Sequence, residues 1–387
     1  MTRMAYGDSL AAGTRVDGDF PVVGSGGISG SHSSSNFRAP GIVVGRKGSY
    51  GSVHWLPSGG FAIDTAYYID ERLTSANLRW LYYVLQAVDL KGPSQDVGVP
   101  GLAREAAYEV SVPAPPSLDE QRCIADFLDA ETARIDQLTA LRSRQSELLG
   151  DHWRSEVSAV LLDLTTRYGD VRIRHLLMGM EQGWSPQCED RLVENGEWGV
   201  VKAGCVNSGK FDASQHKALP AGVEPRREFA IKQGDLLMSR ASGSTKLIGS
   251  VGIVGELRSN LLLCDKVYRL QINRTRAHVD FVAHTLRSHQ VRMHLENGIS
   301  GAEGMANSLP SSVVKDCVIP DVPVGKQSAI ASALDRSAES VARARKALAA
   351  SVGLLAERRQ ALITAAVTGQ FDVSTASGRN VTDGVTT

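Results

Sequence analysis

The chain contains one sequence motif twice. A proline-rich stretch leads into QRCIADFLD at 121–129, and a second one leads into QSAIASALD at 327–335. The Gln, Ile, Ala, Leu and Asp of the two copies match at a constant offset of 206 residues (327 − 121). Prolines cannot continue directly into a helix, whereas the motif itself has a helical pattern of apolar residues. The repeat therefore predicts two globular segments, each followed by a long helix. Such a two-headed molecule suits two separated patches of a partner better than one catalytic pocket.

Length, charge and cysteine usage restrict the class of protein. A chain of 387 residues exceeds one ordinary hydrophobic core, so two or more domains are expected. Lys and Arg total 42, as do Asp and Glu, which excludes a non-specific polycation but permits local basic patches. The five scattered cysteines lack a CxxC pair and are typical of buried free thiols in a reducing cytosol. No apolar run has the length of a signal peptide or membrane span, so we expect a soluble cytoplasmic protein.

Composition and periodicity predict an α+β protein with a pseudo-two-fold internal repeat. Each globular segment follows the order glycine-turned hairpin, strand, helix, proline-containing loop and short strand. The predicted segments are a first globule at 1–116, a helix at 117–165, a second globule at 166–323, a helix at 324–370 and a disordered tail at 371–387.

Several elements are expected within these segments. We predict a strand–turn–strand unit at 41–55, single strands at 61–70 and 261–272, and helices at 77–88 and 278–295. A short strand is expected at 110–116. Further strands are expected at 234–240 and 248–255.

A heptad seam runs along the second long helix, expected at 325–367. Its apolar residues recur every seven positions, which is typical of a coiled coil. The first long helix, expected at 118–164, has a more polar face with Arg142 at a seam position and Leu138 among its apolar residues. The simplest packing places the two helices against each other, antiparallel. The seam residues that we assign are Leu128, Ile135, Leu334, Val341, Leu348 and Leu355.

Sequence motifs of common enzymes are absent. The chain has no GxxxxGK[ST], HExxH or GxSxG sequence, no acidic metal cluster and no DPPY or NPPY motif of amino-methyltransferases. The glycine-rich stretch at 24–30 is not GxGxxG and predicts an ordinary turn. His278, His284, His289 and His294 have no adjacent pair four residues apart, so we assign no metal site. A binding protein is therefore expected, not an enzyme.

In this combination of motifs the chain resembles the specificity subunits of Type I DNA restriction-modification systems. The resemblance rests on the repeated motif and on GRKGSYG at 45–51, FPVVGSGGISG at 20–30 and LITAAVTGQFD at 362–372. It implies target-recognition domains at 1–116 and 166–323, each reading half of a bipartite double-stranded DNA sequence. The two helices would set the spacing and dock methyltransferase (modification) subunits. Restriction/translocase subunits would complete the complex, and the partners would bind S-adenosylmethionine, ATP and Mg. This chain would hold no cofactor or metal and carry no catalysis.

The glycine turns are the candidate DNA contacts. Phosphates supply affinity and attract Lys, Arg and exposed N–H donors, whereas base edges supply specificity. The ordinary alternative is a solvated hairpin tip, and for the seam residues it is packing within the chain instead of partner docking. Arg226, Arg227 and Lys202 are further candidates. The assigned DNA-binding residues are Arg46, Lys47, Ser49 and Tyr50 in the first domain and Arg240, Ser242, Ser244 and Lys246 in the second.

Two other interpretations stay open from the sequence. One is a coiled-coil adaptor that binds protein partners and not DNA. The other is a specificity protein with a damaged first domain. Aligning Gly7 with Gly183 and Ser9 with Ser185 leaves a shorter lead-in before the first motif than before the second, so the first domain is expected to be N-terminally short.

Overall fold

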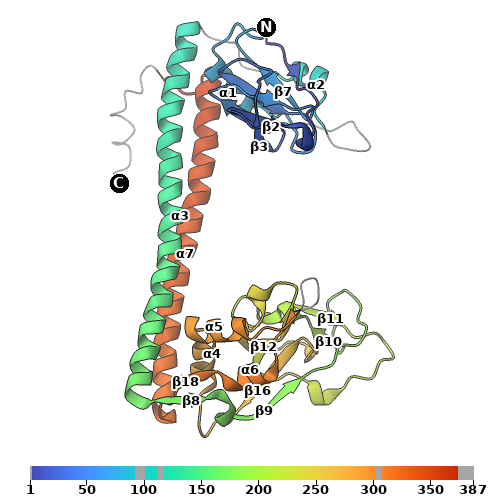
Figure 1. Cartoon of the computed structure of the whole chain (residues 1–387), viewed down its shortest axis with the longest axis vertical. Helices are drawn as coiled ribbons and strands as arrows, with labels where there is room; N and C mark the ends of the chain where they lie inside the picture. The colour runs from blue at the N-terminus through green and yellow to red at the C-terminus, as the bar shows by residue number, and fades with distance from the viewer. Residues whose placement is uncertain (1, 92–100, 112–116, 302–306, 374–387) are drawn as a thin grey trace. The chain divides into compact units, whose positions relative to one another are not determined.

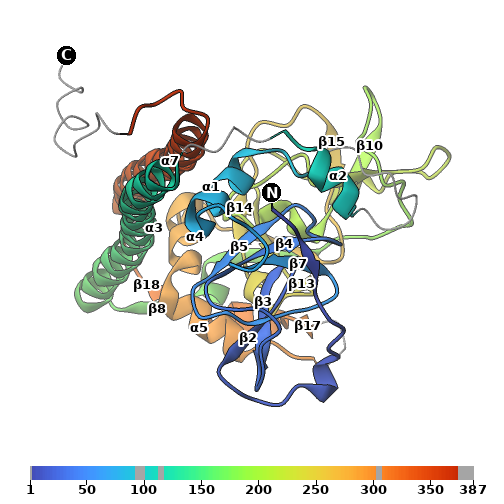
Figure 2. The ribbon, with the colours of Figure 1, turned by 90° about the horizontal axis from the view of Figure 1, so that it is seen from above.

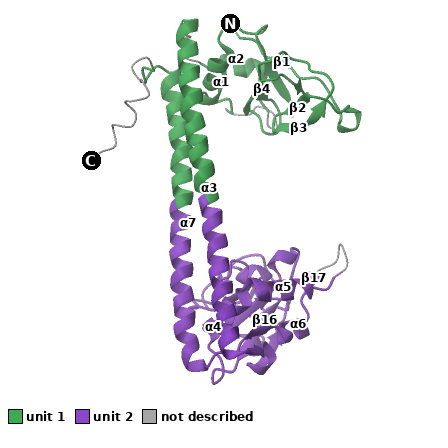
Figure 3. Cartoon of the chain, turned by 60° about the vertical axis from the view of Figure 1, so that its left-hand side comes forward, with its two compact units in different colours: residues 1–144, 348–387 green, residues 145–347 purple. Residues whose placement is uncertain are grey.

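The computed structural model describes residues 2–91, 101–111, 117–301 and 307–373 (Figure 1). The chain forms two compact units, residues 1–144 with 348–387, and residues 145–347 (Figure 3). The long helices α3 (Leu118–Tyr168) and α7 (Val324–Val367) each contribute to both units. The two long helices predicted from sequence are confirmed, with boundaries shifted by four residues or fewer. No helix in the described part of the chain is long and apolar enough to span a membrane.

The main sheet of each unit has four antiparallel strands in the same arrangement. Tyr67 pairs with Tyr6 and Val44 in the first sheet, as Tyr268 pairs with Gln182 and Met238 in the second. The order is β1-β7-β4-β5 in unit 1 and β9-β16-β12-β14 in unit 2. The bounds are β1 (Ala5–Tyr6), β4 (Gly41–Gly45), β5 (Val53–Leu56), β7 (Ala66–Ile69), β9 (Leu177–Gln182), β12 (Leu236–Ser239), β14 (Val251–Ile253) and β16 (Val267–Ile272).

A second sheet in each unit also has the same strand pairing. β2 (Phe20–Gly24) pairs antiparallel with β3 (Gly27–His32) and parallel with β6 (Phe61–Ala62). In unit 2, β10 (Trp198–Val201) pairs antiparallel with β11 (His216–Ala218) and parallel with β15 (Asn260–Leu262). The duplication seen in the helical motif therefore extends to both sheets. The remaining short elements are β8 (Asp170–Arg172) with β18 (Val318–Pro320), β13 (Ala241–Ser242) with β17 (Asn307–Ser308), and the 3-10 turns η1 (Ala12–Thr14), η2 (Ile173–His175), η3 (Ala203–Val206), η4 (Arg227–Phe229) and η5 (Thr245–Leu247).

Close backbone approach fixes one glycine in each unit. A Cβ atom on Gly7 would lie 2.1 Å from the Ile63 carbonyl oxygen, and one on Gly183 would lie 2.0 Å from that of Leu263. No side chain fits at either position, so the alignment of Gly7 with Gly183 corresponds to equivalent places in the two units. The strand that ends just before this glycine is shorter in unit 1, where β1 has two residues, than in unit 2, where β9 has six.

Two predicted strands are each two strands in the structure. The stretch 61–70 divides into β6 and β7, and 261–272 divides into β15 and β16, which belong to different sheets. Both stretches turn at an aspartate, where the amide of Ala66 bonds Ile63 O at 2.9 Å and that of Val267 bonds Cys264 O at 3.2 Å. The sequence did not predict these turns, because the residues on both sides of each aspartate are apolar. A continuous apolar run does not indicate where the chain passes from one sheet to another.

The helices of the globules also differ in part from expectation. The helix predicted at 77–88 is confirmed as α1 (Leu78–Ala87). The helix predicted at 278–295 is broken into α4 (Val279–Arg287) and α5 (His289–Asn297), because Ser288 is extended and its side chain caps α5 by accepting from the Val291 amide. α2 (Arg104–Glu109) ends just before the strand predicted at 110–116; residues 110 and 111 are not in a strand, and residues 112–116 lie outside the described part. α6 (Ser311–Asp316) precedes β18.

Within each unit, the stretches of α3 and α7 lie side by side and antiparallel (Figures 1 and 2). In unit 2, the Ser337 hydroxyl donates to Glu156 at 3.3 Å, and Lys326 donates to the Tyr168 hydroxyl at 3.0 Å. A later residue of α3 thus pairs with an earlier residue of α7, so the two helices run in opposite directions. Ser117 and Glu120 form a reciprocal capping box at the start of α3. The predicted tail at 371–387 falls mostly outside the described residues.

The predicted seam is only partly buried. Leu128, Ile135 and Leu334 are buried, and Val341, Leu348 and Leu355 are half-buried. Leu138, predicted on the apolar face, is 46% exposed, because the less exposed face of α3 continues from the buried Ile135 to the half-buried Thr139.

Candidate nucleic-acid interface

The two glycine loops join equivalent strands of the two main sheets. The loop at 46–52 connects β4 to β5, and the loop at 240–250 connects β12 to β14. Both strand pairs are antiparallel and each lies at the edge of its sheet. The structure therefore brings Arg46, Lys47, Ser49 and Tyr50 together in one loop of unit 1. It brings Arg240, Ser242, Ser244 and Lys246 together in the corresponding loop of unit 2.

Arg46 and Arg240 make matching backbone contacts at the start of these loops. The Arg46 amide bonds Thr65 O at 2.8 Å, and its guanidinium donates to Asp64 O at 3.1 Å. The Arg240 amide bonds Lys266 O at 2.8 Å, and its guanidinium reaches Asp265 O at 3.4 Å. Both arginines are half-buried. Each is therefore already engaged with the turn between the two sheets, which limits how freely its charge can reach a phosphate.

A tyrosine completes each of these arrangements. Tyr67 donates its hydroxyl to Leu102 O at 2.9 Å, and Tyr268 donates to Leu309 O at 2.9 Å. The amides of Leu102 and Leu309 in turn bond the carbonyls of Arg46 and Arg240, each at 2.8 Å. Burial raises the pKa of Tyr67, which keeps its hydroxyl protonated as a donor. We call these two sets of contacts the loop anchors.

The exposed side chains of the loops are the ones available to a ligand. Lys47 and Ser49 are exposed in the first loop, and Ser244 and Lys246 in the second. Tyr50 is half-buried, and its ring packs against the core of unit 1. The Ser242 hydroxyl accepts from the Ser244 amide at 3.3 Å and so shapes the loop.

Further cations lie beside the second loop. Lys202, Lys217 and Lys266 line a cavity of about 480 Å³ within unit 2. Asp190 pairs with Lys202 and Lys217 at 3.3 Å each, and hydrogen bonds from these two lysines lower the pKa of the Asp190 carboxyl. The sequence pointed to Lys202 only, because Lys217 and Lys266 are brought near it by strand pairing between distant segments. Arg226 and Arg227 stack over Trp184 and Trp198, at 4.9 and 5.9 Å from the ring centroids.

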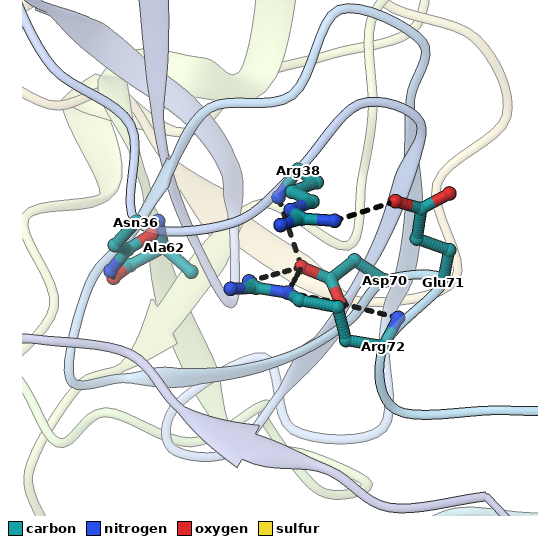
Figure 4. Close-up of polar contacts among 6 residues, drawn as sticks. All are labelled: Asn36, Arg38, Ala62, Asp70, Glu71 and Arg72. Atoms are coloured by element: carbon teal, nitrogen blue, oxygen red, sulfur yellow. Dashed lines mark hydrogen bonds and ion pairs between the residues drawn. The ribbon is translucent and has the colours of Figure 1, made fainter.

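Some exposed arginines of unit 1 serve the fold instead. The Asp70 side chain is fully buried, accepts from the guanidinium of Arg72 and binds the Arg38 amide at 3.0 Å (Figure 4). Burial alone would raise the pKa of Asp70, but these hydrogen bonds outweigh it and hold the pKa below its usual value. The Arg38 guanidinium pairs with Glu71 at 3.0 Å. Asn36 binds the backbone of Ala62 in both directions, at 2.8 and 2.9 Å.

The repeated motif attaches each long helix to its globule. The side-chain carbonyl of Gln121 accepts from the Asn77 amide at 2.7 Å, and that of Gln327 accepts from the His278 amide at 2.7 Å. Asn77 and His278 are the residues that precede α1 and α4. Both glutamines are 3% exposed. The first residue of the motif therefore binds the N-cap residue of a helix in the globule of its own unit, a role that the sequence did not indicate.

The last residue of the motif makes a second attachment. Asp129 accepts from the Tyr83 hydroxyl at 2.6 Å, and Asp335 contacts His284 Nε2 at 2.8 Å. Burial, followed by the hydrogen bond to Asp129, raises the pKa of Tyr83 to about 12. Arg79 Nε also donates to Asp129, at 2.7 Å. Together with the glutamine contacts, these bonds fix how each helix leaves its own globule.

In the part of the chain that the structure describes, the cysteines and acidic groups are scattered. Across the described ranges, no group of three or more His, Cys, Asp or Glu side chains could hold a metal ion. All five cysteines are free thiols, and burial raises the pKa of Cys264 to about 11 and that of Cys317 to about 12. Cys123 is exposed, so the expectation of buried thiols is wrong for this residue. It lies on the first turns of α3, away from the buried row.

The chain is similar in sequence to two specificity subunits. No protein-family model matches the chain. A stretch of 138 residues is 30% identical to the Type I restriction enzyme EcoEI specificity subunit of Escherichia coli, covering 35% of this chain and 23% of that protein. A stretch of 234 residues is 24% identical to the Type I restriction enzyme EcoKI specificity subunit of Escherichia coli strain K12, covering 57% of this chain and 49% of that protein. The matches thus span about a quarter and about half of the relatives' own lengths.

Solved structures share the fold. A chain from a study of complex assembly and conformational transition of the type I R-M system aligns with a TM-score of 0.71 at 14% identity, covering 96% of each chain. The HsdS subunit from Thermoanaerobacter tengcongensis aligns with a TM-score of 0.51 at 16% identity, covering 92% of each chain. The predicted fold class and the resemblance to Type I specificity subunits are confirmed.

Proposed function

We propose that the chain is a non-catalytic specificity subunit, and that each globular domain binds one half of a bipartite double-stranded DNA target. The observation that carries this proposal is the pair of cation-bearing glycine loops. They join equivalent strands of two domains with the same sheet topology. Two equivalent binding surfaces in one chain suit a target with two separated parts. The names of the curated relatives support the same function, and no comparison favours the protein-adaptor alternative.

The proposal assigns the chemistry to partner subunits. Modification subunits would methylate adenine with S-adenosylmethionine, and restriction subunits would use ATP and Mg. The exposed faces of α3 and α7 are the proposed docking surfaces for the modification subunits, with the seam residues holding the two helices together. We place the complex in the cytoplasm, where the five free thiols suit a reducing environment.

Methylation mapping tests this function. The chain is co-expressed with the modification subunit of its own system in a host that lacks restriction-modification, and methylated adenines are mapped by single-molecule sequencing. We expect a new bipartite motif with a fixed gap, which disappears when this chain is omitted. A stable complex that adds no methylation would contradict the proposal.

A further inference from the structure

The second loop is held by a side chain from outside the sheet. Arg292, on α5, donates through Nη1 to Ile248 O at 2.5 Å and through Nη2 to Lys246 O at 3.1 Å. Its Nη2 also donates to Glu296 Oε1 at 2.9 Å. Only 19% of the Arg292 side chain is exposed. One guanidinium therefore ties together the far part of the loop and the helix beneath it.

These contacts act on the part of the loop that the loop anchor does not reach. The anchor holds Arg240 at the loop's beginning, and the Gly249 amide closes its end on Ser239 O at 2.7 Å. Between them lies η5, which carries Lys246. Hydrogen bonds from a charged donor are roughly twice as strong as neutral ones. Arg292 therefore attaches this middle part to α5 through charged hydrogen bonds, beside the buried Ile248 side chain, which packs in the core of unit 2.

Close packing supports the same conclusion. Gly249 has φ +79°, and a Cβ there would lie 2.9 Å from Leu295 Cδ1 and 3.0 Å from Arg292 Nη1. A side chain at this position would be strained and would also push the loop away from α5. Glu296, one turn along the helix, holds the guanidinium in the orientation that faces the two carbonyls. The loop is thus fitted to α5 at a defined distance.

The first loop is anchored in another way. The Gly51 amide bonds Gly45 O at 2.9 Å, and the Ser52 hydroxyl donates to Ser25 O at 2.5 Å. The Lys47 amide also bonds Thr65 O at 3.1 Å, and the loop anchor holds Arg46. These attachments come from the loop itself and from Ser25 and Thr65 of neighbouring strands and turns. An effect of Arg292 is therefore confined to the second domain, and the first loop is an internal control.

We infer that Arg292 is a positioning residue for target recognition by the second domain, and that it presents Lys246 and Ser244 to DNA without touching the duplex. This inference rests on the proposed function. Replacing Arg292 frees the middle of the loop, so the second domain loses discrimination over its half of the target while the first domain keeps its own.

The first measurement needs no DNA. Amide hydrogen exchange is followed in the full-length chain for the wild type, Arg292→Met and Arg292→Lys. Met keeps the apolar stem, and Lys keeps the charge but donates from a single point. We expect peptides spanning 244–250 to exchange about tenfold to a hundredfold faster in Arg292→Met and by an intermediate factor in Arg292→Lys. Peptides spanning 46–52 should not change. Unchanged exchange at 244–250 overturns the inference.

The second measurement is the methylated motif. Arg172→Met, which removes an exposed arginine of β8 in the same unit, serves as the matched control for lost charge. In Arg292→Met we expect one half of the bipartite motif to become degenerate and the other half to stay unchanged, with the control giving the wild-type motif. If the Met variant does not fold, Arg292→Lys carries the same test. Faster loop exchange with a wild-type motif and rate refutes the role in recognition. If the wild-type chain forms its complex but no methylated motif is found, the proposed function itself is refuted, whatever the exchange result.

Discussion

Gln327 provides a quantitative test of how the repeated motif joins helix to globule. It is 3% exposed, accepts from the His278 amide at 2.7 Å and donates to Val322 O at 2.7 Å. Gln327→Met keeps the size and shape of the side chain but leaves that amide and carbonyl without a partner. A stranded buried polar group costs about 1–3 kcal/mol, and the added apolar burial offsets part of this. We expect the free energy of unfolding of unit 2 to fall by roughly 2–4 kcal/mol.

Equilibrium urea unfolding and native-state hydrogen exchange of α4 measure this loss. Gln290→Met, at an exposed position on α5, is the matched control and should change stability by less than about 0.5 kcal/mol. Exchange in α1, which belongs to unit 1, should be unaffected. A loss below about 0.5 kcal/mol for Gln327→Met, or one equal to that of the control, would refute the attachment role that we assign to the motif.

Three further predictions concern charge and burial. Lys47→Ala with Lys246→Ala should weaken DNA binding across sequences and reduce the slope of log K against log salt by about 1.8, which is measured by titration at several salt concentrations; an unchanged slope excludes both lysines as phosphate contacts. The lowered pKa of Asp70 stabilises the fold above about pH 4, the usual carboxyl range, and this contribution disappears as the pH falls through the lowered value. Asp70→Asn should therefore flatten the acid side of the stability profile in pH-dependent thermal unfolding, and an unaltered profile would contradict the assignment. Cys123 should react promptly with a thiol reagent, whereas Cys317 should react only on unfolding; equal rates in the native protein would refute the burial of Cys317.

The sequence contained the long-range plan of the fold because that plan has a period. Heptads predict long helices, and the repeat of Gln121 at Gln327 predicts that two similar bodies precede them. Local signals also sufficed where a turn is rich in glycine, as between β4 and β5. They failed at Asp64 and Asp265, where the chain passes from one sheet to the other within an apolar run. They also failed at Ser288, because a serine inside a helical pattern reads equally well as a surface residue or as a cap.

The candidate site was predictable as a place but not as a set of roles. Glycine and cationic residues marked both loops, yet the partners of Arg46 and Arg240 are backbone carbonyls of the distant turns at Asp64 and Asp265. Such partners depend on strand pairing, which a local reading does not reveal. Arg292 was outside every motif, because nothing in a short helix signals that one arginine will reach a loop more than forty residues earlier.

The duplication itself separates scaffold from reading surface within this single chain. Positions that keep the same residue in both units, such as Tyr67 and Tyr268, make the same hydrogen bond in both. The exposed side chains of the two loops differ, with Lys47 and Ser49 in the first and Ser244 and Lys246 in the second, and two halves of a bipartite target need different contacts. Arg46 and Arg240 belong to the first group although they are cations. Replacing either should therefore destabilise its loop as well as weaken DNA binding, whereas replacing Lys47 should affect DNA binding alone.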